Sequence, residues 1–292
     1  MLVHGQLDDD TAYDVLEAYG AGDALRPLRS LGQLNAALPW LANSFPTHRA
    51  FAQTNLAGIL GPRLAKASSI EINWLASVVL LNRGERFEVL PLPDVAQLAP
   101  VFGVAVADFN GDDQADALLA QNFFGEQFGM PRQDAGRTLL LRGDGRGRFA
   151  EEAIVEAEAG FAGEGRGVVV GDFSEAFSLT AAVAHAHGPV QTVEYGPVTS
   201  RPWVRLRGDE GNPAAVGAKL RWVKSGRNGA VFEIQLGSGY ASANSTAVLL
   251  PFAEPGSQLE VRWPGGKRTL STLPAKSGRV EIQPDGSVRP LP

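Results

Sequence analysis

The richest set of metal-ligand side chains in the sequence lies between residues 108 and 116. Oxygen-bearing side chains stand at positions 1, 3, 5 and 9 of this segment, as Asp108, Asn110, Asp112 and Asp116. Such a loop folds around a hard cation, and Gln114 can add its backbone carbonyl. Calcium fits better than magnesium because the segment supplies mostly protein oxygens in a flexible shell. Three carboxylates also repel one another unless a cation neutralises them. The spacing therefore predicts a calcium site.

The segments on either side of this loop are short apolar runs. Residues 102–107 precede the loop, and residues 117–120 follow it. Both runs have the length of a β-strand, whereas an EF-hand needs long amphipathic helices. The loop is therefore expected to join two strands. The alternative is an acidic surface turn that holds no ion.

The run Phe-Gly-Val-Ala-Val-Ala-Asp-Phe-Asn-Gly-Asp, residues 102–112, resembles an FG-GAP/VCBS repeat. This resemblance implies a blade of an integrin-α-type β-propeller, with calcium held by the loop. The match departs at Asp113, where the family usually has glycine. That position tends to need a positive φ, which Asp tolerates better than most residues. The departure weakens the predicted site without removing it.

A second resemblance covers the last third of the chain. It rests on four blocks in a fixed order, at residues 203–208, 212–221, 234–244 and 259–268. Their order and spacing resemble the ASPIC/UnbV domain, which commonly follows FG-GAP repeats in cartilage-acidic-protein-like chains. That family has no well-established biochemical activity, so the resemblance implies architecture more than function.

The stretch from residue 31 to about residue 93 looks like the helical insertion that bacterial members carry between blades. Ser30 can cap a short helix that runs to Leu38. Thr47 starts a second one, with its apolar residues on one face, and the pair at 61–62 (Gly-Pro) stops it. We interpret this part as helices that pack against the side of the propeller and carry no catalytic residues.

The fold class expected from these patterns is mainly β: a partial β-propeller of FG-GAP/VCBS blades with a helical insertion, followed by a β-sandwich-like ASPIC/UnbV domain. Residues 1–69 would form the helical insertion or the remnant of an earlier blade. Residues 70–200 would form the propeller blades, and residues 201–292 the ASPIC/UnbV-like domain. The 34 glycines and 19 prolines, with short apolar runs between them, agree with many strands joined by tight turns.

Composition excludes several classes of function. The sequence has no cysteine, so it has no disulfide, thiolate metal site or cysteine nucleophile. No apolar run is long enough to span a membrane. The first ten residues lack the basic and apolar regions of a signal peptide. Relatives of this kind usually carry a signal peptide and earlier blades, so we expect a fragment of a secreted or periplasmic protein. Missing N-terminal blades, or self-association, would then cover the open sheet faces.

Charge is distributed unevenly along the chain. Residues 201–292 hold 13 Lys and Arg against 7 Asp and Glu, whereas residues 1–200 hold 13 against 25. This split falls at the expected domain boundary and can help the domains dock on each other. The basic residues alternate along the predicted strands instead of forming a block, as on the polar face of a half-buried strand. Because the whole chain has a net charge of −6, nucleic acid is not expected as a partner.

An internal repeat runs through the middle of the chain. Residues 78–87 are echoed at 138–149, and residues 103–108 are echoed at 167–172. Aligning Asp172 with Asp108 puts Ser174, Ala176 and Thr180 where the other three loop ligands stand. One carboxylate is too few for a calcium cage, so one calcium site is expected.

Possible catalytic groups in the sequence are isolated. His185 and His187 lack a third metal ligand nearby, and the Gly-rich segments lack the Lys-Ser/Thr of a phosphate loop. Ser238, between two glycines, has no evident base partner. An enzyme is therefore less well supported than a binding protein, and no catalytic residue is predicted.

The function that we expect is non-catalytic binding or cell adhesion outside the cytoplasm, with calcium holding a blade loop rigid. The partner would be a glycan or a protein. Tyr240, in the segment 237–244, is the candidate aromatic anchor if its ring is exposed; the other interpretation is that the ring packs at the edge of the sandwich. An enzyme-associated role, hydrolase-like or accessory to a biosynthetic cluster, is the alternative function.

Overall fold

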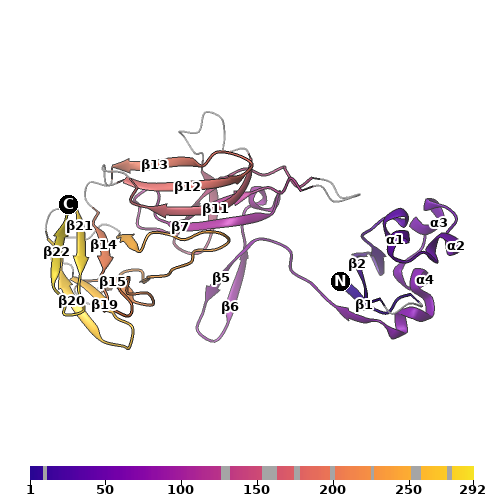
Figure 1. Ribbon diagram of the computed structural model, residues 1–292, viewed down its shortest axis with the longest axis horizontal. Coiled ribbons are helices and arrows are strands. Elements are labelled where there is room, and N and C mark those ends of the chain that lie inside the picture. The colour runs from indigo at the N-terminus through magenta and orange to yellow at the C-terminus, as the bar shows by residue number, and fades with distance from the viewer. Residues whose placement is uncertain are drawn as a thin grey trace. The chain divides into compact units, whose positions relative to one another are not determined.

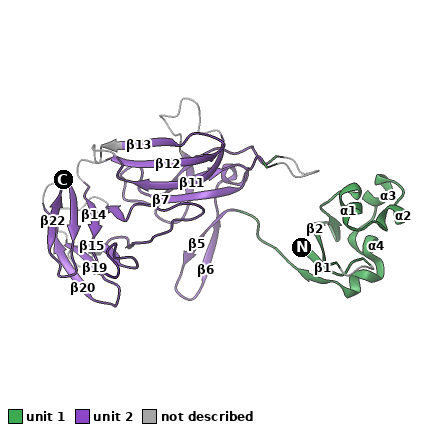
Figure 2. Ribbon diagram, in the orientation of Figure 1, with its two compact units in different colours: residues 1–76, 125–132 green, residues 77–124, 133–292 purple. Residues whose placement is uncertain are grey.

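The computed structural model describes residues 1–8, 12–125, 132–152, 163–173, 178–197, 201–224, 227–250, 258–274 and 278–292 (Figure 1). These residues form several β-sheets and a few short helices, so the expected mainly β class is confirmed. The chain divides into two compact units (Figure 2). One consists of Met1–Ala76 with Gly125–Arg132, and the other of Ser77–Phe124 with Gln133–Pro292.

The first unit combines a small sheet with short helices. Its antiparallel sheet has the order β3-β2-β1-β4. The strands are β1 (Leu2–Gly5), β2 (Asp14–Ala21), β3 (Ala24–Pro27) and β4 (Ser68–Ile70). The helices are α1 (Leu31–Ala37), α2 (Leu41–Ser44), α3 (His48–Ala52), α4 (Leu56–Leu60) and the 3₁₀ helix η1 (Gly61–Lys66). The assignment of residues 1–69 to a helical insertion or to the remnant of an earlier blade stays a prediction.

The helix boundaries follow local capping chemistry. Ser30 begins α1 with a reciprocal capping box to Gln33, as the sequence predicted. The second predicted helix is split into α3 and α4, because the Asn55 side chain accepts a hydrogen bond from the Gly58 amide and starts a new helix. The apolar residues expected on one face are nevertheless all buried, namely Phe51, Leu56, Ile59 and Leu60.

The second unit begins with a hairpin and continues with two antiparallel sheets. The hairpin pairs β5 (Val78–Asn82) with β6 (Phe87–Pro91), and the short 3₁₀ helix η2 (Asp94–Gln97) follows it. The first sheet has the order β10-β9-β8-β7, from β7 (Val101–Ala107), β8 (Asp116–Gln121), β9 (Leu139–Gly143) and β10 (Phe149–Glu152). The second has the order β11-β12-β13, from β11 (Glu164–Gly171), β12 (Ser178–Ala186) and β13 (Gln191–Pro197).

Strands β7 and β11 approach each other closely, and glycine permits this. A Cβ atom on Gly103 of β7 would lie 2.8 Å from a Val168 methyl group and 2.9 Å from the Arg166 carbonyl oxygen, both on β11. Any larger residue would push the strands apart. Among the described strands the sheets do not close into a ring, so the partial propeller stays a prediction.

The remaining strands form two sheets around one apolar core. One sheet has the order β18-β14-β21-β22, from β14 (Trp203–Leu206), β18 (Ala247–Leu249), β21 (Arg279–Ile282) and β22 (Val288–Leu291). The other has the order β16-β15-β19-β20, with β17 beside β15, from β15 (Lys219–Lys224), β16 (Arg227–Asn228), β17 (Phe232–Glu233), β19 (Gln258–Arg262) and β20 (Arg268–Thr272). Val204 and Ile282 of the first sheet share the core with Leu220 and Val261 of the second.

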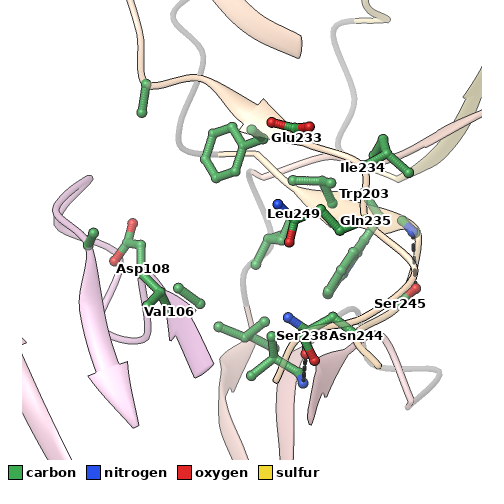
Figure 3. Close-up of a pocket in the computed structure, with 18 of the residues that line it drawn as sticks. Val106, Asp108, Trp203, Glu233, Ile234, Gln235, Ser238, Asn244, Ser245 and Leu249 are labelled. Carbon is green, nitrogen blue, oxygen red and sulfur yellow. Dashed lines mark hydrogen bonds between the residues drawn. The ribbon is translucent and has the colours of Figure 1, made fainter. Parts of the chain in front are cut away.

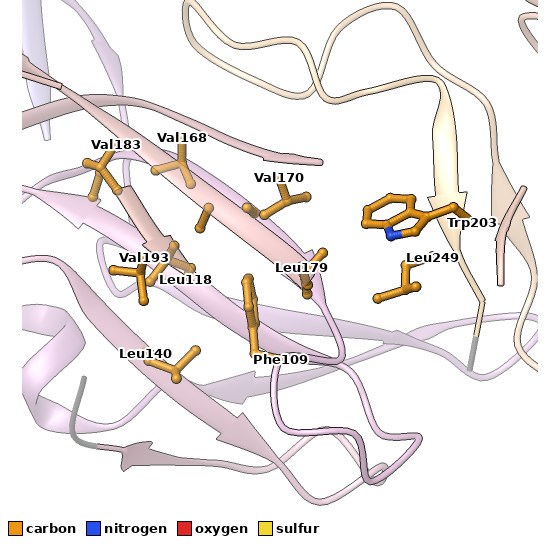
Figure 4. Close-up of a cluster of buried hydrophobic side chains, with 13 residues drawn as sticks. Phe109, Leu118, Leu140, Val168, Val170, Leu179, Val183, Val193, Trp203 and Leu249 are labelled. Atoms are coloured by element: carbon orange, nitrogen blue, oxygen red, sulfur yellow. The ribbon is translucent and has the colours of Figure 1, made fainter. Parts of the chain in front are cut away.

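A separate core joins this C-terminal pair of sheets to the sheets before it (Figure 4). Trp203 and Leu249 lie in the same buried cluster as Phe109, Val170 and Leu179. Burying a large aromatic ring at such a contact removes much apolar surface from water. The two parts of the second unit are therefore held by a continuous apolar contact. None of the described helices has the length and apolar character needed to cross a membrane.

Candidate functional site

The predicted calcium loop connects β7 to β8. The last residue of β7, Ala107, pairs with Asp116, the first residue of β8. Asp108 is the centre of the loop, because its carboxylate accepts backbone N–H bonds from Gly111 at 2.7 Å, Asp112 at 3.2 Å and Asp113 at 3.0 Å. The loop thus curls around the first predicted ligand.

The next two predicted ligands lie at the surface. Asn110 donates a side-chain hydrogen bond to Asp112 Oδ2 at 3.1 Å, and Asn110 Oδ1 accepts the Asp112 amide at 3.0 Å. Asp112 Oδ1 accepts the Gln114 amide at 2.9 Å. Both residues are exposed, and Arg142 Nη2 lies 3.5 Å from Asp112 Oδ2.

The last predicted ligand is buried. Asp116 is 1% exposed, and its two carboxylate oxygens accept the amides of Phe109 at 3.0 Å and Gly143 at 2.9 Å. Burial raises the pKa of Asp116 above its usual range, and the two backbone hydrogen bonds oppose this shift. A cation beside this carboxylate would favour its charged form.

The backbone at Asp113 has the predicted conformation. Its φ is 64°, in the left-handed region, and Gly111 has a φ of 82°. Asp113 therefore has the left-handed backbone conformation predicted for its position, which Asp tolerates better than most residues.

The donor set fits calcium in kind, but the oxygens are not gathered. Across the described ranges, no three His, Cys, Asp or Glu side chains are grouped so that they could hold a metal ion. The carboxylates of Asp108, Asp112 and Asp116 are instead engaged by N–H groups of the loop and its neighbours. An ion would have to draw Asn110 and Asp112 inward.

An arginine from the C-terminal part of the chain occupies one side of the loop. Arg201 Nη2 lies 3.0 Å from Asp108 Oδ2, and the two side chains are only 6% and 9% exposed. The same guanidinium donates to the Asp108 carbonyl at 3.3 Å and to the Leu250 carbonyl at 3.1 Å. The buried carboxylate is therefore already compensated by a fixed positive charge.

The equivalent aspartate of the second hairpin also pairs with an arginine. Asp172, which the repeat aligns with Asp108, forms a two-bond ion pair with Arg279, and one of these bonds is 2.8 Å long. Arg279 begins β21, next to Trp203 in β14, and Arg201 lies just before β14. Arg201 and Arg279 thus lie at the beginnings of two neighbouring strands, and each pairs with the aspartate of a different hairpin.

Sequence reasoning did not identify these two arginines. The signal for them was the charge split at residue 201, which indicated electrostatic docking without naming the residues. Arg201 and Asp108 are 93 positions apart, and no local pattern encodes such a pair.

The segment 237–244 forms a hairpin-like loop along the edge of β11. Ser242 Oγ accepts the Val168 amide at 3.0 Å, and Asn244 Oδ1 accepts the Val170 amide at 3.0 Å. These bonds fix the loop and satisfy amides on the free edge of β11. Asn244 is therefore committed to the fold.

Tyr240, at the tip of this loop, is 59% exposed. Its ring packs edge-on against Phe102, with centroids 5.9 Å apart. Phe102 in turn lies under the Arg166 guanidinium, whose Cζ is 3.9 Å from the ring centroid, and Arg166 also faces Phe123. The interpretation that Tyr240 packs into the sandwich edge was wrong, because the loop lies along β11 and leaves the ring outside.

Comparison with known families agrees with the second resemblance. The family model described as "ASPIC and UnbV" matches residues 208–288, so this part of the chain is an ASPIC/UnbV domain. The match includes β15, β19, β20 and β21. A search of curated proteins found no matching relative.

The Arg201–Asp108 pair should stabilise the fold strongly. Arg201→Met leaves a buried carboxylate without its cation, and we expect a loss of about 3–5 kcal/mol of unfolding free energy. Urea unfolding with a chelator present measures this. The exposed pair Arg83–Glu88, with side chains 52% and 46% exposed, is the matched control, and Arg83→Met should cost less than about 1 kcal/mol. If both variants lose the same unfolding free energy, the buried pair stabilises the fold no more than an exposed pair does.

Proposed function

We propose that this chain is a non-catalytic, calcium-binding module that binds a glycan outside the cytoplasm. The observation that carries this proposal is the exposed ring of Tyr240 on a loop that is bonded to β11. Exposed aromatic residues on loops that the fold holds in place are common at recognition surfaces.

The geometry around Tyr240 prepares it for binding. Its ring is oriented by Phe102, and the loop below it is closed by a Ser238–Ser242 backbone bond of 3.0 Å. A tyrosine ring has few rotatable bonds, so little side-chain entropy is lost when a ligand packs on it. A preorganised aromatic platform favours stacking with the apolar face of a sugar ring.

The neighbouring groups add polar capacity. Arg166 lies over Phe102 and is paired with the buried carboxylate of Glu164. A guanidinium presents several N–H donors in a fixed plane. Sugar hydroxyls can accept hydrogen bonds from such a group while the ring stacks on Tyr240. We therefore favour a glycan over a protein ligand.

The calcium part of the proposal rests on the donor set between Asp108 and Asp116. Asp108, Asn110, Asp112 and Asp116 would supply side-chain oxygens, and Gln114 its carbonyl. Calcium would neutralise the carboxylates and hold the loop in one conformation. Since Arg201 already places a positive charge on Asp108, we expect an affinity at the weak end of the range for such loops.

We further propose that the two hairpins β7–β8 and β11–β12 are FG-GAP/VCBS-like blade units. Their registers support this: Ala107 pairs with Asp116, and Gly171 pairs with Thr180, each pair shifted by the same spacing in the sequence. The two aligned aspartates are also held by arginines in the same manner.

Calcium should bind with 1:1 stoichiometry and a dissociation constant of roughly 10⁻⁴ to 10⁻³ M, as in extracellular modules. Asp112→Ala removes a charged ligand and should weaken binding at least about tenfold. Isothermal calorimetry measures both. Asp285→Ala is the control, because Asp285 accepts the amide of Ser287 in the turn between β21 and β22 and should leave calcium binding unchanged. Unchanged calcium uptake in Asp112→Ala would remove the assignment.

The calcium effect should depend on pH in a defined direction. Burial raises the pKa of Asp116, so on acidification this group takes up its proton at a higher pH than an exposed Asp. As the pH is lowered, the increase in melting temperature caused by calcium should therefore be lost before the pH reaches the ordinary Asp pKa of about 3.9. Without calcium the sign is opposite: the contribution of Asp116 to stability is full below its unfolded pKa and is lost as pH rises through the folded pKa. Thermal unfolding between pH 3.5 and 7, with calcium and with chelator, tests both; an increment that persists to the lowest pH would contradict the role of Asp116.

Tyr240→Ala should weaken glycan binding at least about tenfold without changing stability. The ring is exposed, so its removal costs the fold little, whereas the loss of a central aromatic anchor reduces affinity at least about tenfold. A glycan array identifies the ligand, and titration of the strongest hit compares variants. Tyr19→Ala is the control, since Tyr19 is 49% exposed on β2 of the other compact unit. Equal binding by both variants would locate the glycan site elsewhere.

A further inference from the structure

A cavity of about 340 Å³ lies between the calcium-type loop and the ASPIC/UnbV domain (Figure 3). Val106 and Asp108 form one side of it, and the segments around Ile234 and Asn244 form the other. Its volume is within the range of small-molecule sites. It is too small for a folded partner, so the relevant occupant is a small molecule.

The walls of the cavity are mainly apolar. Val170, Leu179, Trp203 and Leu249 line its inner end, and all four belong to the core that joins the two parts of this unit. Such a lining excludes a strongly hydrated ligand, because the ligand would lose its water without replacement. The occupant must therefore have an apolar body.

Two polar atoms of the lining have no hydrogen-bond partner among the residues that the structure describes. Trp203 is 2% exposed, and its Nε1 is a buried donor without an acceptor; the buried Ser238 Oγ is likewise unpaired. Figure 4 shows the indole nitrogen on the edge of the ring that faces Leu249, another residue of the lining. Buried donors are almost always satisfied, so an orphan N–H at the wall of a cavity indicates a missing acceptor.

The charges of the lining restrict the ligand further. Asp108 is paired with Arg201, and Glu233 with Lys219 at 3.0 Å. Asp113 adds another acidic group. The carboxylates outnumber the cation of the lining, so an anionic ligand is disfavoured. A neutral molecule with an oxygen acceptor fits both the apolar walls and the orphan donor.

The cavity is open to solvent at its rim. Val106 and Val231, both of which line it, are 60% and 57% exposed. Ala230 lies at the same rim and is also exposed. A ligand can therefore enter without unfolding of either part.

We propose that this cavity is a binding site for a small neutral organic molecule with an apolar body and a carbonyl-type acceptor, which takes a hydrogen bond from Trp203 Nε1. Neither calcium nor the Tyr240 surface is required for it. The cavity proposal is therefore independent of the calcium and glycan proposals, and a negative result for one does not bear on the others.

The test uses acetophenone and ethylbenzene, which share a carbon skeleton and differ in the carbonyl oxygen. In ¹H–¹⁵N spectra of the full chain, acetophenone should shift the Trp203 indole N–H signal downfield in a saturable manner. Ethylbenzene should bind without that downfield shift. Trp203→Phe assigns the signal and should weaken acetophenone binding about threefold to tenfold, while ethylbenzene binding stays within about twofold.

Two other indoles serve as internal controls. Trp263 Nε1 already donates to Thr269 Oγ1 at 2.9 Å. Trp40 Nε1 has no hydrogen-bond partner within the described part of the chain and does not line this cavity. Neither signal should move. Ala230→Phe fills the rim, keeps the Trp203 N–H and should abolish both ligands' binding with an unchanged urea midpoint. An immobile Trp203 signal, equal shifts with both ligands, equal shifts of Trp40, or full binding by Ala230→Phe would each overturn the proposal.

Discussion

The buried contact between Arg201 and Asp108 is the constraint on which the rest of the second unit depends. An ion pair with both partners almost fully out of water is favourable only when the geometry satisfies most of their hydrogen bonds. Here the guanidinium also reaches two backbone carbonyls, and the carboxylate accepts three loop amides. Displacing the C-terminal sheets would leave these charges unpaired, so these sheets and the loop hold each other in place.

The second arginine makes this contact directional. Arg279 binds Asp172 as Arg201 binds Asp108, and the two arginines belong to neighbouring strand starts. Two ion pairs define an orientation that one pair would leave free to rotate. Trp203 follows Arg201 by two residues and pairs with Arg279 in the register of β14 and β21. Its ring fills the apolar part of the same contact. The charge pairs thus supply specificity, and the indole supplies buried area.

The proposed functional features of this unit lie beside the strands that lead into these two ion pairs. The loop that carries Tyr240 satisfies the edge of β11, and the cavity lined by Trp203 lies beside the calcium-type loop. Calcium at the loop would act on a site where a fixed cation already neutralises Asp108. The ion's contribution would therefore fall mainly on Asp112 and Asp116, whose charges have weaker or no cationic compensation.

The sequence by itself determined the features that depend on neighbouring residues. Short apolar runs of strand length indicated β7 and β8, the blocks after residue 203 indicated the ASPIC/UnbV domain, and Ser30 indicated the start of α1. The positive φ at Asp113 also followed from the local turn. All of these rest on backbone geometry and side-chain chemistry within a few positions.

Only the tertiary structure decided which distant groups meet. The partner of Asp108, the burial of Asp116 and the exposure of Tyr240 arise from contacts between segments far apart in the chain. A one-dimensional pattern records that a residue is charged or aromatic, but its pKa, pairing and accessibility depend on what packs against it. For this reason the sequence predicted which oxygen-bearing side chains the loop offers to a cation, whereas only the fold placed Arg201 against one of them, Asp108.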